Sequence, residues 1–203
     1  MARWQLKENN RWCAWVKCNP AKATLLMLLF GLTLGIIFWG GFNTAIEWTN
    51  RTEFCISCHE MTIPYEEYKE SAHYSNTAGL AVSCSDCHVA SSKTPNDYAR
   101  KLLRKLLAAR DVFGHLRGTI DTPEKYEEKR LEMAKRVWES MRASDSAECR
   151  NCHNLERMDP EQRSRIARNR HARAVEEGTT CIECHRGVSH HEPVIPLEEL
   201  GQY

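Results

Sequence analysis

The chain has 203 residues, of which 28 are Lys or Arg and 27 are Asp or Glu, and its formal net charge is +1. This near-neutral balance argues against a nucleic-acid-binding protein, because such a protein needs an excess of basic side chains on one face to displace counterions from phosphates. The unusual feature of the composition is its supply of potential metal ligands, ten Cys and nine His.

An apolar segment near the N-terminus is predicted to span a membrane. Residues 23–46 read ATLLMLLFGLTLGIIFWGGFNTAI, 24 residues without a charged side chain, and about 20 apolar residues in a helix are enough to cross a bilayer. A cleavable signal peptide is the alternative, but its apolar region is usually about 7–15 residues long and is followed by a small-residue cleavage site. We therefore predict an uncleaved membrane anchor.

The charges around this anchor predict its orientation. Residues 1–22 contain five basic residues and one acidic residue, and the positive-inside rule places such a segment in the cytoplasm. Residues 47–203 then form a periplasmic domain of a protein held in a bacterial inner membrane by a single pass. Cys13 and Cys18 lie on the reducing side of that membrane, where we expect free thiols.

Four Cys-x-x-Cys-His motifs occupy the predicted periplasmic domain. They comprise Cys55, Cys58 and His59; Cys84, Cys87 and His88; Cys149, Cys152 and His153; and Cys181, Cys184 and His185. This pattern is typical of c-type haem attachment, in which both thiols bond to the porphyrin and the adjoining His is offered to the iron. Zinc sites and disulfide frameworks also use paired cysteines, but neither explains a His after every second Cys. We therefore predict four covalently bound haem c groups.

The motifs fall into two pairs, over residues 55–88 and 149–185, with a helical insert over residues 95–142 between them. Two helices, 95–113 and 123–141, are predicted in the insert because each begins with Thr followed by Pro, a capping residue and a favoured first helical residue. A Gly after the first helix offers a stop. We expect an all-α protein, whose periplasmic domain has little regular secondary structure and uses the four macrocycles as its apolar interior.

Each iron needs a second axial ligand unless it binds substrate, and neutral imidazole is the usual choice in electron-transfer haems. Five histidines lie outside the motifs: His73, His115, His171, His190 and His191. We favour His73, His171 and His190 as ligands over the other two.

The single anchor, the paired motifs, and the stretches SAH at 71–73, RDVFGH at 110–115 and CHRGVSH at 184–190 resemble the NapC/NirT family of membrane-anchored tetrahaem quinol dehydrogenases. The resemblance covers nearly the whole chain. It implies that electrons pass from menaquinol or ubiquinol through four haems to a periplasmic reductase. A nitrate reductase is the expected partner, since the chain supplies a full set of distal His, and a nitrite reductase, as in the related NrfH proteins, is the alternative. A tethered electron store or redox sensor without quinol chemistry is the rival class.

The resemblance also implies the axial ligands. For haems 2 to 4 they are His88 with His171, His153 with His190, and His185 with His73, respectively. His191 remains a rival for His190, and in the NrfH branch the partner enzyme can replace the ligand that corresponds to His171. For haem 1, the implied ligand is Met61, with His59 turned away. An ordinary His59-ligated haem with Met61 nearby is the alternative.

The helix over residues 95–113 is expected to carry the quinol site, because quinol oxidation releases protons and Asp111 ends an apolar row on this helix. The resemblance implies Lys105 and Asp111 beside haem 1, whereas helical geometry alone favours Arg104 as the partner of Asp111. Both basic residues remain candidates. They would also suit a basic helix face lying against lipid headgroups.

Overall fold

A computed structural model describes residues 19–89, 95–158 and 164–199, and it contains no β-strand within these ranges. The prediction of an all-α protein is confirmed. The chain divides into two units, Met1–Trp48 and Thr49–Tyr203. Cys13, Cys18 and most of the predicted cytoplasmic segment lie outside the described residues.

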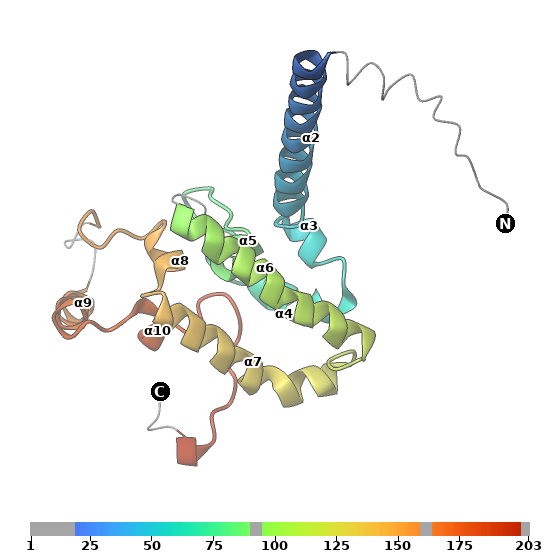
Figure 1. Ribbon diagram of the computed structural model, residues 1–203. Helices are drawn as coiled ribbons and strands as arrows, with labels where there is room; N and C mark the ends of the chain where they lie inside the picture. The colour runs from blue at the N-terminus through green and yellow to red at the C-terminus, as the bar shows by residue number, and fades with distance from the viewer. Residues whose placement is uncertain (1–18, 90–94, 159–163, 200–203) are drawn as a thin grey trace. The chain divides into compact units, whose positions relative to one another are not determined.

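The first unit contains the apolar helix α2, Pro20–Trp48 (Figure 1). Its 29 residues give a length of about 43 Å at about 1.5 Å per residue, more than the roughly 30 Å of a bilayer core. Among the described helices it alone is long and apolar enough to cross a membrane, and the side chains of its most apolar stretch are exposed. The predicted N-terminal membrane helix is therefore present, and it extends a few residues beyond 23–46 at both ends.

Short helices carry the four motifs in the second unit. They are α3 (Thr52–Cys55) and the 3₁₀ turn η1 (His59–Met61) for the first motif, and α5 (Cys84–His88), α8 (Ala147–Arg150) and α10 (Cys181–Cys184) for the others. Helices α5 and α10 begin with capping boxes, in which the acid between the two cysteines accepts a bond from the backbone of the preceding Ser or Thr. The residues between the cysteines thus fix the local helix that presents both thiols.

The two predicted long helices are α6 (Pro95–Leu116) and α7 (Pro123–Ala143), joined by a short turn in Figure 1. The side chain of Thr122 caps α7 by accepting from the Lys125 backbone N–H, as predicted. Helix α6 does not stop at Gly114 but continues for a further turn. The stop is Gly118, which adopts the left-handed conformation with φ 61° and so ends the helix where Gly114, with no positive φ, does not.

Three further short elements complete the described fold. Helix α4 (Thr62–Lys69) follows η1 directly, α9 (Arg165–Glu177) lies between the third and fourth motifs, and the 3₁₀ turn η3 (Leu197–Glu199) is near the C-terminus. Helix α9 was not predicted. It is capped by Ser164, whose side chain accepts from the Ala167 N–H, and it ends at Gly178 with φ 67°.

The described protein core is small for a domain that extends from residue 49 onward. Trp138 and Met141 of α7 pack with Ile182 of α10, and a few partly buried apolar side chains surround this cluster. Few other apolar side chains in the described ranges are buried. This agrees with the expectation that haem macrocycles supply most of the apolar interior.

Candidate haem sites

Each motif histidine faces a second histidine across a gap of similar width. The ring centroids are separated by 5.8 Å for His59 and His115, 6.1 Å for His88 and His190, 6.2 Å for His153 and His73, and 6.0 Å for His185 and His171. These four pairs use all four motif histidines and four of the five remaining histidines of the chain.

The separations fit an iron between the two rings. Metal–imidazole bonds are about 2 Å long and the ring centre lies roughly 1.2 Å beyond the ligating nitrogen, so two imidazoles on opposite faces of one iron have centroids about 6.3 Å apart. All four observed separations lie within about 0.5 Å of this value. The residues present therefore fit four haem groups, each of which would be held by one motif and by a pair of imidazoles.

The combination of rings differs from the one that the family resemblance implies. His190 faces His88 rather than His153, His73 faces His153 rather than His185, and His171 faces His185 rather than His88. The loop after the fourth motif explains two of these differences. It reaches α4, where the Nδ1 atom of His190 lies 3.1 Å from the carbonyl oxygen of Pro64. The carbonyl of Val188, in the same loop, lies 3.2 Å from Nδ1 of His73.

Hydrogen bonds at Nδ1 orient three of the four distal rings. His73 and His190 donate to the backbone carbonyls just named, and His115 donates to a carboxylate oxygen of Glu60 over 2.6 Å. A bond that holds the proton on Nδ1 leaves the lone pair of Nε2 for a metal and fixes the ring orientation. For His171, Nδ1 is buried and has no hydrogen-bond partner among the described residues.

Burial favours the neutral imidazole that an iron requires. Desolvation lowers the pKa of His88 to about 4, and the neighbouring His190 and Arg104 lower it further. Desolvation also lowers the pKa of His190, although Glu67 opposes this change. Both rings are therefore uncharged at neutral pH, as a metal ligand must be.

His191, the fifth candidate ligand, faces no other ring in the described chain. Its Nδ1 lies 3.6 Å from a carboxylate oxygen of Glu67 and its Nε2 lies 3.4 Å from Glu70, and its side chain is 67% exposed. Of the two adjacent histidines, His190 is therefore the one that lies opposite a motif histidine.

The attachment cysteines form a series that follows the order of the motifs. The side chains of Cys55 and Cys84 lie within hydrogen-bonding distance of each other. Burial raises the pKa of Cys87 to about 11, and the adjacent Cys149 adds to this effect. Burial likewise raises the pKa of Cys149, with a further contribution from Cys181. Helix α3 packs on α5 and α5 packs on α8. The attachment points of haems 1 to 4 are therefore consecutive neighbours.

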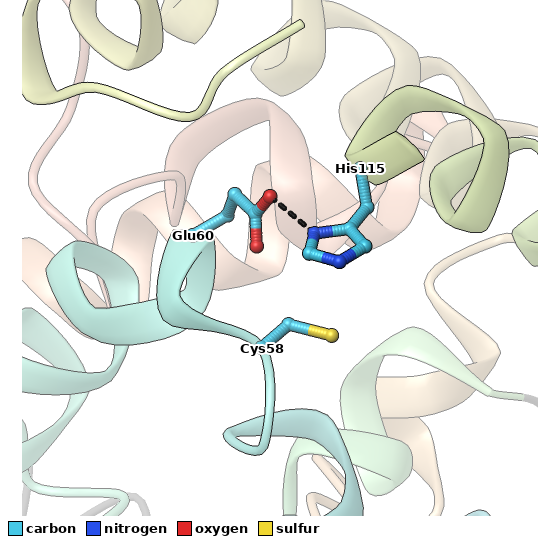
Figure 2. A group of neighbouring side chains, drawn as sticks. All are labelled: Cys58, Glu60 and His115. Atoms are coloured by element: carbon cyan, nitrogen blue, oxygen red, sulfur yellow. Dashed lines mark hydrogen bonds and ion pairs between the residues drawn. The ribbon is translucent and has the colours of Figure 1, made fainter. Parts of the chain in front are cut away.

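Figure 2 shows the surroundings of the first motif, where Cys58, Glu60 and His115 converge. Glu60 lies in η1, and its side chain is only 4% exposed. Its Oε1 accepts from His115, while its Oε2 lies 3.6 Å from Nδ1 of His59. Met61 ends the same turn and is partly exposed. The ring of His59 lies beside that of His115, with 5.8 Å between the ring centroids.

Burial alone would raise the pKa of Glu60, but the hydrogen bond from His115 and a backbone N–H donor outweigh it, so this pKa is lowered. The carboxylate is therefore ionised at neutral pH. Glu60 was not among the predicted site residues, and His115 was not among the favoured ligands. One sequence feature could have pointed to His115 as a site residue, namely its position at the end of the helix that also carries Lys105 and Asp111.

The candidate quinol residues of α6 lie in different surroundings. Lys105 donates through Nζ to the carbonyl oxygen and to Oγ1 of Thr49, at 2.8 and 2.9 Å, and its charge acts on the nearby Cys55. Arg104 instead forms an ion pair of 3.3 Å with Glu148, whose side chain is 2% exposed. The two basic residues are therefore directed to different motifs, Lys105 to the first and Arg104 to the third.

Asp111 lies one helical turn before His115, so the two side chains share a face of α6. Its side chain is accessible, yet partial burial raises the pKa of its carboxyl, while Arg110 and Arg136 oppose the change. Asp111 is thus a carboxylate that takes up a proton more readily than an ordinary Asp, next to the ring opposite His59.

Comparison with known proteins shows the family of this chain. The profile of the NapC/NirT cytochrome c family, N-terminal region, matches residues 18–195. The denitrification system component NirT of Stutzerimonas stutzeri is 51% identical, over 85% of this chain and 84% of the relative. The cytochrome c-type protein NapC of Escherichia coli K12 is 46% identical over 90% of both chains, and NapC of Paracoccus pantotrophus is 47% identical over 86% of this chain and 73% of the relative.

No solved structure matches the chain significantly. The profile match extends over the apolar helix and all four motifs. The chain therefore belongs to the NapC/NirT cytochrome c family, as a tetrahaem electron-transport protein that one helix anchors in the inner membrane, with its haem domain in the periplasm.

Proposed function

We propose that this protein is a quinol dehydrogenase that takes electrons from menaquinol or ubiquinol and delivers them to a periplasmic reductase. The observation that carries this proposal is the pairing of every motif histidine with a second histidine of the same chain. Irons with both axial positions filled have no open position for reducing a substrate, so bound haems would supply one-electron relay rather than substrate chemistry.

We infer which histidines would hold each haem iron from the four pairs of neighbouring rings. The proposed pairs are His59 with His115 for haem 1, His88 with His190 for haem 2, His153 with His73 for haem 3, and His185 with His171 for haem 4. Hydrogen bonds at Nδ1 support three of the four distal assignments. Met61 is then a neighbour of haem 1 rather than its ligand.

We place the quinol site beside haem 1, at Lys105 and Asp111. Thr49, to which Lys105 donates, directly follows the last residue of α2 in the chain, so Lys105 is tied to the point where the chain leaves the membrane helix. Lys105 can donate a hydrogen bond to a quinol oxygen, and Asp111 can accept a proton from a quinol hydroxyl. The ion pair with Glu148 gives Arg104 a structural role instead.

Proteoliposomes that contain the purified holoprotein test the quinol site. Replacing Asp111 by Asn is expected to slow haem reduction by menaquinol or ubiquinol analogues at least tenfold, because the proton acceptor is lost, while reduction by dithionite keeps its rate. A tethered electron store or redox sensor fills from soluble donors only. If quinol reduces the D111N and parent proteins equally fast, Asp111 is not the proton acceptor, and if quinol reduces neither, the dehydrogenase proposal fails.

We propose a periplasmic nitrate reductase as the partner, with a nitrite reductase as the alternative. All eight proposed axial histidines belong to this chain, so the partner need not contribute a ligand to haem 2 or to another haem. Stopped-flow reoxidation of the quinol-reduced protein distinguishes the two. Fast reoxidation is expected with nitrate reductase and nitrate, and faster reoxidation with nitrite reductase and nitrite would reverse the assignment.

A further inference from the structure

Glu60 is a buried carboxylate that neither haem attachment nor quinol binding uses. Its Oε1 accepts the Nδ1–H of His115 over 2.6 Å (Figure 2). Its Oε2 lies 3.6 Å from Nδ1 of His59. Within the described part of the chain, this second oxygen is buried and has no hydrogen-bond partner. One carboxylate therefore lies next to both imidazoles that face each other at the first motif.

The cluster of Cys58, Glu60 and His115 could hold a metal ion by distance alone, since its donor atoms lie within 4.8 Å of one another. A separate metal site does not follow, because the thiol of Cys58 belongs to the first haem-attachment motif and becomes a thioether there. With that thiol used and the Nδ1 proton of His115 directed at Glu60, the geometry is that of a carboxylate supporting a histidine ligand.

The acceptor at His115 differs in kind from those at His73 and His190. His73 donates to the carbonyl of Val188 and His190 to the carbonyl of Pro64, both of which are neutral, and the carboxylate nearest to Nδ1 of His190, that of Glu67, lies 4.0 Å away. His115 donates to an anion, and a carboxylate acceptor makes the opposite nitrogen of an imidazole a stronger base. A more basic axial ligand stabilises ferric over ferrous iron, and the negative charge nearby acts in the same direction.

We propose that Glu60 is a positioning residue for haem 1, which fixes the orientation of His115 through their hydrogen bond, places a negative charge close to His59, and lowers the reduction potential of that haem. This inference rests on the proposed ligation of haem 1 by these two histidines. A lowered potential makes haem 1 a weaker acceptor from quinol and a stronger donor to haem 2, so Glu60 helps to set the direction of electron flow at the entry point.

Potentiometric titration of the purified holoprotein, followed by magnetic circular dichroism and EPR, tests this role. The matched variants are E60Q and E53Q. Both remove one negative charge near the first motif, but Glu53 is exposed, whereas Glu60 is buried next to His59 and His115. Haem 1 is identified as the haem that becomes high-spin in H115A, because that variant removes one of its two proposed ligands.

The E60Q variant is expected to retain four bis-histidine haems, since Gln can still accept the bond from His115. Its ratio of reduced to oxidised haem 1 at a fixed potential should rise about tenfold, which is about 59 mV for a one-electron couple. E53Q should change the ratio far less. E60A, which also loses the hydrogen bond, is expected to broaden the EPR signal of haem 1 as the ring of His115 becomes free to rotate.

Two results would overturn the inference, and they are distinguishable. If the parent protein shows a methionine-ligated haem and H115A keeps all haems low-spin, the proposed ligation is incorrect and the role of Glu60 falls with it. If ligation is as proposed but E60Q shifts the reduction potential of haem 1 no more than E53Q does, Glu60 is only a structural neighbour. Neither readout depends on quinol turnover, so the dehydrogenase proposal is tested separately.

Discussion

Replacing Arg130 by Met should destabilise the haem domain more than the loss of any surface ion pair. The guanidinium makes two bonds to the carboxylate of Glu67, NH1 to Oε2 at 3.1 Å and NH2 to Oε1 at 2.6 Å. It also donates to the carbonyl of His191, whose N–H donates in turn to Glu67. The side chains of Arg130 and Glu67 are only 12% and 7% exposed.

The variant would leave the Glu67 carboxylate buried without its main counter-charge. Removing one partner of a buried ion pair costs roughly 3–5 kcal/mol. We expect a loss of about 3 kcal/mol, the lower end of that range, because the guanidinium of Arg130 retains some exposure. For a chain of this length, 1 kcal/mol corresponds to about 2–4 °C in Tm, so the expected decrease is about 6–12 °C.

Thermal unfolding of the holoprotein, followed by circular dichroism, measures this loss. The matched control is K129M on the same helix, because Lys129 and Glu132 form an exposed pair of 3.7 Å that is worth about 0–1 kcal/mol. A Tm of R130M within about 2 °C of the Tm of K129M would refute the reasoning.

The pH dependence of the Tm difference between R130M and the parent protein provides a second check. In the parent protein, burial raises the pKa of Glu67, but the hydrogen bond from Arg130 outweighs it and the pKa is lowered. Without Arg130, burial dominates and the folded-state pKa lies above the unfolded value. The penalty for a carboxyl with a raised pKa is present above the unfolded pKa and disappears below it. The Tm gap between R130M and the parent should therefore be largest near neutral pH and narrow as the pH falls below about 4.3.

Three further predictions concern the quinol site, the haem ligands and the turn after α6. Because the pKa of Asp111 is raised by burial, quinol oxidation should slow as the pH falls through a value above the ordinary Asp range, and stopped-flow rates for D111N should lack that decline. The ring planes of His185 and His171 are nearly parallel, at 8°, so EPR should show one rhombic low-spin signal that H171A removes. The ring planes of His153 and His73 are 77° apart and should give a large-g signal. G118A should lower stability by about 1–2 kcal/mol in denaturant titrations, since an added Cβ at φ 61° would also lie 2.6 Å from a side-chain oxygen of the following turn.

The sequence predicted the features that depend on local pattern. An uninterrupted apolar run identified the membrane helix, Thr-Pro pairs located the starts of both long helices, and the spacing of Cys and His identified four haem motifs. The end of α6 was predicted wrongly, at Gly114, because the sequence does not show which of the two glycines adopts the positive φ that Gly118 has in the structure. The membrane helix, the two helix starts and the four motifs are decided within a few residues of the chain, so a single sequence suffices to find them.

The combination of rings could not be predicted in the same way. Whether His190 lies opposite His88 or His153 depends on how the loop after the fourth motif meets α4, a contact between residues more than 100 positions apart. Likewise, nothing in the local sequence shows that Glu60 meets His115 or that Arg104 meets Glu148. Residue types identify the candidates, but only tertiary contacts select among them.

The segment of residues 59–73 connects these tertiary contacts. It supplies a proposed ligand at each end, His59 for haem 1 and His73 for haem 3. Residues between these two ends accept hydrogen bonds from histidines of other segments. Glu60 orients His115, and the carbonyl of Pro64 accepts from His190, the proposed ligand of haem 2. Three of the four proposed axial pairs therefore depend on one stretch of 15 residues, numbered 59 to 73. Glu67 in this stretch binds Arg130 of α7, so loss of that ion pair should disturb the spectrum of haem 2 as well as lower the Tm. The ring pair of His171 and His185 uses no residue of the segment, so its EPR signal should be unchanged.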